Sequence, residues 1–372
     1  MNPPGLLRQA PTPRAWDSRV KSAFWKNLIQ YGIGAALLAY IISINWEGKP
    51  GSQTPGLGDV FAKPFHIGPL ILAALIWTVS LLITFVRWWL LVRAQGLQFS
   101  LYNALRLGLV SYFFNTFLPG SVGGDILKAV AVARGQSRRT VAVATVIIDR
   151  IIGLWALAWL VALLGSIFWV TNNPYLLNNE ALKTIVRATA AIVIGSAFAW
   201  SLLGLQTEER AERIATRLGR IPKVGHSLGE IWRACSLYRR QSTVVAIALG
   251  MTLVAHTGWV VIFYLCVSAF PDIDLPTLAE HFLIVPVGMT AQALFPLPGG
   301  IGGGEMAYGW LYTKLDKAAT GGIVGCLVQR VIAWGIGLIG YIIYTRMKKD
   351  LPAEAMATTE PATASANGPA ES

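Results

Sequence analysis

Six long apolar runs constrain the fold of this chain more than any other feature. Each has about 20 residues or more, the length that an α-helix needs to cross the roughly 30 Å hydrocarbon layer of a bilayer. One or two such runs can be buried in a soluble bundle, but six leave no polar face for water. The sequence therefore predicts an all-α, polytopic integral membrane protein. The runs cover residues 24–46, 67–91, 141–170, 183–205, 242–270 and 319–346.

Composition and charge agree with a membrane location. The chain of 372 residues is 54% hydrophobic and only 13% charged, whereas soluble domains are about 25% charged. The net charge of +12 is explained by basic cytoplasmic loops, so we expect no nucleic-acid partner. The three cysteines, Cys235, Cys266 and Cys326, are too widely spaced for a metal motif or a disulfide framework. We therefore expect no metal and no cofactor.

The distribution of Lys and Arg predicts the topology. Basic residues precede the first run and follow the last one, whereas the loops at 47–66 and 171–182 carry few. By the positive-inside rule, both termini then lie in the cytoplasm of a multi-pass protein of the cell (inner) membrane. Residues 206–240 carry eight Lys or Arg. This basic cytoplasmic linker fits either an amphipathic surface helix or a solvated connection.

Three parts of the chain are expected from these boundaries. Residues 1–20 and 347–372 read as disordered tails because they are rich in Pro, Ala, Thr or charge and poor in apolar side chains. Residues 21–346 form the transmembrane domain.

Two glycine-rich strings interrupt the apolar chain, LPGSVGGD at 118–125 and LPGGIGGGE at 297–305. Proline stops an incoming helix, and glycine permits the tight turn that follows. Basic residues flank the first string on both sides, which predicts a re-entrant hairpin entered from the cytoplasm. The second string lacks such flanks and predicts a hairpin entered from outside. The expected architecture is about six spans plus two opposed re-entrant hairpins.

The two strings belong to an internal repeat. Asp125 and Glu305 are 180 residues apart, and Arg150 and Arg330 have the same separation. The run at 67–91 maps at this offset onto 247–271. Repeat units of about 67–170 and 242–346 then cross the membrane in opposite directions. Such inverted-topology repeats are typical of secondary transporters.

The loops and the intramembrane arginines form a candidate site for an anion. Helix N-termini present free N–H groups to phosphates, and a guanidinium binds phosphate through a planar fork. The candidate substrate-binding residues are Asn115, Pro119, Gly120, Gly123, Gly124, Asp125, Arg150, Pro298, Gly299, Gly303, Gly304, Glu305 and Arg330.

Structural alternatives remain open for these residues. The carboxylates can cap the helices that begin beside them. Asp125 with Arg150, and Glu305 with Arg330, can form ion pairs within each unit, either as permanent pairs or until a substrate arrives. Asn115 can cap backbone groups or contact a headgroup. Two further polar residues, His256 and His281, are interpreted either as proton relays or as packing histidines.

Three segments carry a family resemblance. NTFLPGSVGGDILK at 115–128, TVIIDRIIGL at 145–154 and FPLPGGIGGGEMAYGWLY at 295–312 resemble the lysylphosphatidylglycerol synthase transmembrane-region family, whose members are also called flippase-like. The resemblance covers roughly residues 20–346. It implies movement of an anionic or aminoacylated phospholipid between leaflets. The large aminoacyl-transferase domain of the full synthases has no counterpart in this stand-alone membrane part, so lysyl transfer is not implied.

These observations predict a lipid translocase that is not an enzyme. It would move an anionic phospholipid or a polyprenyl-phosphate-type lipid, with the phosphate held at the loop tips by Arg150 and Arg330. The alternatives are a membrane enzyme acting on a lipid phosphate, and an ion or small-solute transporter. The expected partners are membrane lipids with anionic headgroups. A second copy of the chain and a lipid-modifying enzyme are further candidate partners.

Overall fold

The computed structural model describes residues 13–48, 55–118, 123–134, 136, 138–222 and 225–347. Within these ranges the chain folds into α-helices and one short 3₁₀ helix, with no strand. The tip residues Pro119 and Gly120 lie outside the described residues. The helix that begins at Pro13 starts within the predicted N-terminal tail. The elements are α1 Pro13–Ile44, α2 Leu57–Ala62, α3 Ile67–Ala94, α4 Leu101–Phe117, α5 Gly123–Ala133, α6 Arg139–Val170, α7 Pro174–Leu177, α8 Glu180–Leu203, α9 Glu208–Gly219, α10 Gly225–Arg239, α11 Ser242–Ser268, α12 Leu278–Leu294, η1 Pro298–Gly300, α13 Gly303–Thr313 and α14 Ala319–Met347.

Five of these helices, α3, α6, α8, α11 and α14, are long and apolar enough to cross a membrane. They correspond to five of the six predicted runs, with ends that differ by a few residues. In α1 the apolar stretch is shorter and covers Leu28–Ile44. The protein is thus a multi-pass helical membrane protein, and a sixth span remains a prediction.

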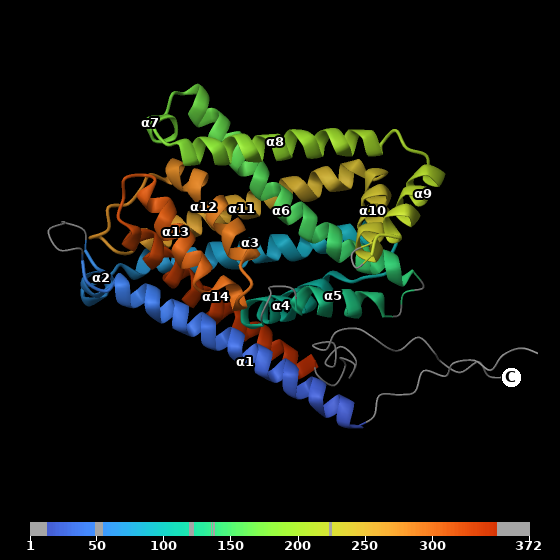
Figure 1. The fold of residues 1–372 in the computed structure, drawn as a ribbon, viewed down its shortest axis with the longest axis horizontal. Helices are drawn as coiled ribbons and strands as arrows, with labels where there is room; N and C mark the ends of the chain where they lie inside the picture. The colour runs from blue at the N-terminus through green and yellow to red at the C-terminus, as the bar shows by residue number, and fades with distance from the viewer. Residues whose placement is uncertain are drawn as a thin grey trace, which may run out of the picture.

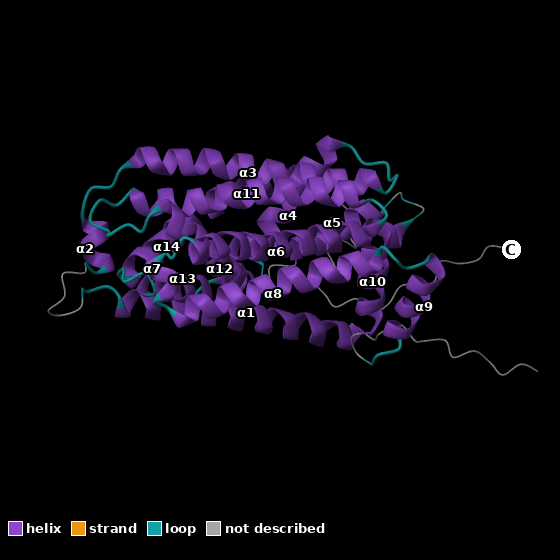
Figure 2. Ribbon diagram, turned by 90° about the horizontal axis from the view of Figure 1, so that it is seen from above, coloured by secondary structure: helices purple, strands orange, loops and turns teal. Residues whose placement is uncertain are grey.

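The long helices lie roughly side by side along the longest axis of the molecule (Figure 1). Helices α2 and α7 lie at one end, and α9 and α10 lie at the other. Helix α3 leads from the α2 end toward α4, whereas α11 leads from α10 back toward α12, so the two helices run antiparallel. They pack against each other along their length (Figure 2).

The helix order of the predicted repeat is present in the fold. Helices α3, α4, α5 and α6 have 28, 17, 11 and 32 residues. Helices α11, α12, α13 and α14 follow in the same order with 27, 17, 11 and 29 residues. The starts of α5 and α13, and of α6 and α14, differ by 180 positions, those of α4 and α12 by 177, and those of α3 and α11 by 175. The match of 67–91 with 247–271 is therefore five residues out, because both the connection before the second short pair and the loop within that pair are longer than their counterparts.

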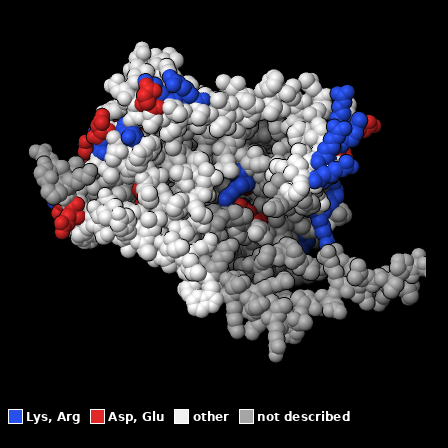
Figure 3. Space-filling view, in the orientation of Figure 1, with Lys and Arg blue, Asp and Glu red and all other residues white. Residues whose placement is uncertain are grey.

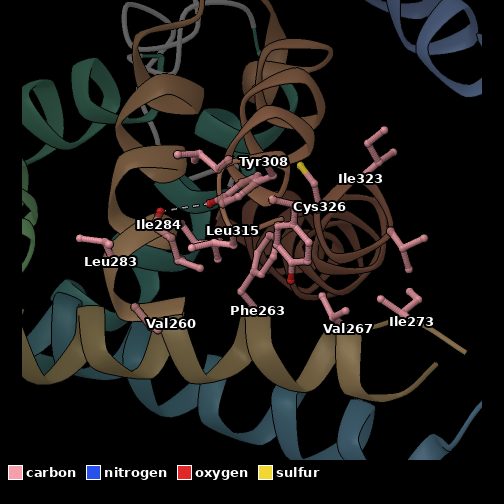
Figure 4. Close-up of a cluster of buried hydrophobic side chains, with 14 of the residues drawn as sticks. Val260, Phe263, Val267, Ile273, Leu283, Ile284, Tyr308, Leu315, Ile323 and Cys326 are labelled. Atoms are coloured by element: carbon pink, nitrogen blue, oxygen red, sulfur yellow. Dashed lines mark hydrogen bonds between the residues drawn. The ribbon is translucent and has the colours of Figure 1, made fainter. Parts of the chain in front are cut away.

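The largest apolar core lies where α11, α12, α13 and α14 meet (Figure 4). Its centre is a tilted aromatic contact between Phe263 and Tyr308, whose ring centroids lie 4.2 Å apart. Small residues allow the close approach of these helices; Gly322 is so near α13 that an added β-carbon would lie 2.2 Å from the Tyr308 carbonyl oxygen. The second unit therefore has a tightly packed apolar core.

Basic side chains gather at the end formed by α9 and α10 (Figure 3). The predicted basic linker forms these two helices, which pack against each other. Arg233 of α10 donates to Glu212 of α9 at 2.7 Å. This hydrogen bond holds the pKa of the Glu212 carboxyl below its ordinary value.

Candidate functional site

A cavity of about 390 Å³ lies between the two helical units. Four basic side chains line it, from Arg87, Lys128, Arg150 and Arg330, but only two acidic ones. Its walls come from α3, α4, α5 and α6 of the first unit and from α11, α12, η1 and α14 of the second. Figure 3 shows charged atoms in the middle of a largely uncharged face, between the charged ends of the molecule. A basic cavity at this depth must contain water or an anion, because charges in hydrocarbon are costly.

In the second unit, Glu305 and Arg330 form the ion pair that was one of the two predicted alternatives. The Nε and Nη2 atoms of Arg330 lie 2.9 and 2.7 Å from Oε1 of Glu305. Nη1 of Arg330 donates to the carbonyl oxygen of Gly299 at 2.9 Å. The backbone N–H of Gly302 donates to Oε2 of Glu305 at 2.8 Å. Both side chains are buried, so this pair joins α14, α13 and the second loop into one unit.

In the first unit, the equivalent pair is looser. Nε of Arg150 lies 3.5 Å from Oδ2 of Asp125, and the Arg150 side chain is 42% exposed. Asn115 of α4 contacts the start of α5: its Oδ1 accepts a hydrogen bond from the Gly124 N–H at 2.8 Å. Its Nδ2 donates to Oδ1 of Asp125 at 3.3 Å. Asn115 thus caps the backbone, which is one of its two predicted roles. It also lines the cavity, and its contact with a headgroup stays a prediction.

The loop between α12 and α13 lies against the end of α4. Gly299 has a φ of +55°, and a β-carbon on it would lie 3.0 Å from the Thr116 carbonyl oxygen at the end of α4. The second loop therefore approaches the backbone at the end of α4 so closely that glycine is favoured at this position. Gly299 lines the cavity. The candidates Gly123, Pro298, Gly303 and Gly304 shape the turns behind the cavity rather than line it.

Three charged residues of the cavity were missed as candidates by the sequence analysis. Arg87 of α3 donates through Nε to Oδ1 of Asp149 at 2.8 Å and through Nη1 to Oγ1 of Thr252 at 2.7 Å. Lys128 of α5 lies 4.0 Å from Oδ2 of Asp149. Arg87 and Lys128 belong to the basic residues on either side of the first string, which the sequence analysis used only to predict the topology, and both are buried. A signal was present, since Asp149 lies inside an apolar run and a buried carboxylate needs a cation.

The two candidate histidines differ. His281 is a packing residue, bonded through Nδ1 to the Thr277 carbonyl oxygen and through Nε2 to the Tyr312 hydroxyl. His256 lines the cavity, and its Nε2 lies 3.0 Å from the Gly153 carbonyl oxygen. Among the described residues, no group of three His, Cys, Asp or Glu side chains gathers as a metal site would require.

Fold and cavity together define a class: a polytopic helical membrane protein with a basic, partly exposed cavity between two units of equal helix order. The sequence matches the lysylphosphatidylglycerol synthase TM region over residues 61–340, and the chain belongs to this family. The family predicted from the three motifs is therefore confirmed. Comparisons with curated proteins and with solved structures gave no match.

Proposed function

We propose that the protein is a lipid translocase that moves an anionic lipid between leaflets without changing it chemically. The observation that supports this most directly is the basic cavity between the two units, which fits the phosphate of a headgroup. Its volume of about 390 Å³ lies within the range of ligand pockets, about 300–1,000 Å³. This is room for a headgroup, while the acyl or prenyl chains stay in the bilayer. Membership of a family named for a lipid synthase supports a lipid substrate.

Arg150 is the principal phosphate ligand in this proposal. Its guanidinium is partly exposed and its contact with Asp125 is 3.5 Å long, so a phosphate oxygen competes with the carboxylate for it. Arg330 is buried and held by Glu305 and Gly299. It therefore contributes positive potential from the cavity wall and holds the second loop in place.

The short helix pairs, α4 with α5 and α12 with α13, act as two opposed re-entrant hairpins of an inverted repeat. Gly299 in the second loop contacts Thr116 near the end of α4, and irregular backbone at membrane depth is tolerated where it lines a wet cavity. The end with α9 and α10 faces the cytoplasm because its helices are basic. Rocking of one unit against the other then opens the cavity to each leaflet in turn.

Transport in liposomes tests the proposal. The purified protein should move a fluorescent anionic phospholipid across the bilayer with its mass unchanged. Arg150→Gln should abolish movement while the protein stays folded. The control is Arg187→Gln, because Arg187 of α8 lies over the Trp169 ring and does not line the cavity. A product of altered mass would indicate an enzyme, and normal movement by the Arg150 variant would contradict the assignment of the phosphate site.

A further inference from the structure

Lys128 is a buried cation without a full set of partners. Its ammonium group lies 4.0 Å from Oδ2 of Asp149 and 4.8 Å from the centroid of the Trp88 ring. The residue is only 5% exposed and it lines the cavity. An ammonium group can donate three hydrogen bonds, and no hydrogen bond from it reaches any of the described residues.

Asp149 does not balance this charge, because Arg87 already neutralises it. Arg87 donates through Nε to Oδ1 of Asp149 and through Nη2 to its backbone carbonyl oxygen at 3.2 Å. Two buried cations therefore share one carboxylate. A buried charge that is not paired and fully hydrogen-bonded is costly, so this arrangement favours an additional anion beside Lys128.

The second unit shows that the fold does not require these charges. By the helix starts, Tyr308 corresponds to Lys128, Gln329 to Asp149 and Ile262 to Arg87. Tyr308 packs on Phe263 in the apolar core (Figure 4), as Lys128 packs on Trp88. The same helical frame is thus stable with neutral residues at all three positions. The charges in the first unit point to a ligand rather than to folding.

Lys128 and the Asp125–Arg150 pair lie at different depths along α5. Residues three apart on a helix are neighbours, with β-carbons about 5–6 Å apart, so Lys128 lies roughly one helical turn beyond Asp125. A second polar group lies beside the face of α5 that carries Lys128, because Gly124 and Lys128 are four residues apart on this helix. Ser111 is 1% exposed, lines the cavity, and its Oγ has no hydrogen-bond partner within the described part of the chain. Ser111 contacts α5 at Gly124, one turn before Lys128.

We infer that Lys128 and Ser111 form a second anionic subsite beside Asp125, the partner of Arg150, with Lys128 one helical turn further along α5, and that the substrate is a lipid whose headgroup carries two linked anionic groups, such as a prenyl diphosphate. This inference rests on the proposed function and names the substrate class of the same cavity. One phosphate is bound at Arg150. The other accepts hydrogen bonds from the Lys128 ammonium and the Ser111 hydroxyl. A lipid monophosphate reaches only one of the two groups of donors.

Binding of three probes to the full chain in detergent micelles tests this inference. The probes are farnesyl diphosphate, farnesyl monophosphate and inorganic pyrophosphate. A hydrogen bond to a charged group contributes about 1.5–3 kcal/mol, so the diphosphate should bind roughly tenfold or more tightly than the monophosphate. Lys128→Gln should remove this preference, because the variant keeps the volume and leaves Asp149 paired with Arg87. Lys128→Arg should retain it, and Ser111→Ala should reduce it.

Tyr308→Phe is the matched control, since it changes the equivalent position of the other unit and should leave the preference intact. Equal affinity for the two farnesyl probes would overturn the inference while leaving the proposed function in place. An equal loss of both affinities in the Lys128 and Ser111 variants would overturn it too. Pyrophosphate binding as tightly as farnesyl diphosphate would overturn the assignment to a lipid. Failure of the diphosphate probe to bind would overturn the inference, whereas the proposed function is decided separately by the transport of an anionic phospholipid in liposomes.

Discussion

The two ion pairs at equivalent positions should differ strongly in their contribution to stability. Glu305 is fully buried, and its Oε1 lies 2.7 Å from Nη2 of Arg330. Glu305→Gln keeps the side-chain volume and one acceptor oxygen but leaves the Arg330 charge buried without a counter-ion. Removal of one partner of a buried pair costs about 3–5 kcal/mol. The folding equilibrium constant should therefore fall by roughly two to four powers of ten.

The matched control is Asp125→Asn. Its partner Arg150 is 42% exposed and the pair distance is 3.5 Å, so solvent screens the interaction and the expected loss is about 0.2–1 kcal/mol. The double variant Glu305→Gln with Arg330→Gln should recover part of the loss, because no buried charge is then left alone. Unfolding by SDS in mixed micelles, followed through the chain's 14 tryptophans, measures all four proteins. Equal losses for Glu305→Gln and Asp125→Asn would refute the reasoning.

Two further predictions concern packing and pH. A β-carbon on Gly340 of α14 would lie 2.2 Å from the Leu109 carbonyl oxygen of α4, whereas a β-carbon on Gly335 of the same helix would have nothing within 4 Å. Gly340→Ala should therefore lower the free energy of unfolding in the SDS assay by about 1–3 kcal/mol or more, and Gly335→Ala should not lower it. Equal effects of the two substitutions would contradict the packing of α14 on α4. The lowered pKa of Glu212 means that its hydrogen bond with Arg233 stabilises the α9–α10 hairpin above the ordinary carboxyl pKa of about 4.3, a contribution lost as pH falls through the lowered value. Hydrogen-exchange protection in α9 and α10 should decrease on acidification below about pH 4, less so in Glu212→Gln; protection independent of pH would contradict this.

Apolar length and helix-breaking residues made most of the fold predictable. The run predicted at 141–170 became α6, Arg139–Val170, and that at 319–346 became α14, Ala319–Met347. The glycine-rich strings fell between helices of the same lengths in both units. The pair of Glu305 and Arg330 was also within reach of the sequence, since each acid lies 25 positions before its arginine, and a buried charge needs an opposite one.

The cluster of Arg87, Lys128 and Asp149 was not predictable in the same way. Its members come from α3, α5 and α6, and no spacing rule relates side chains on three separate helices. Lys128 also precedes a group of arginines, so its charge was counted with theirs as a cytoplasmic flank. Only the packing of α5 against α4 and α6 turns it inward, and that packing depends on tertiary contacts such as the close approach of Gly124 to Ser111.

Under the proposed function, the difference between the two pairs predicts that Arg150 exchanges its carboxylate for a phosphate and that Arg330 does not. If a phosphate took Arg150 from Asp125, the Asp125 carboxylate would keep the hydrogen bond from Asn115 Nδ2 and its position in the first turn of α5, where the helix dipole favours a negative charge. If a phosphate took Arg330 from Glu305, that carboxylate would keep the Gly302 N–H and its own place in the first turn of α13, but its charge would be left without a counter-ion at a fully buried position. Exchange is therefore cheap in the first unit and costly in the second. A substrate that enters this cavity should displace Asp125 while Glu305 keeps Arg330 and the second loop in place, so we expect the second unit to form the fixed wall of the proposed headgroup site.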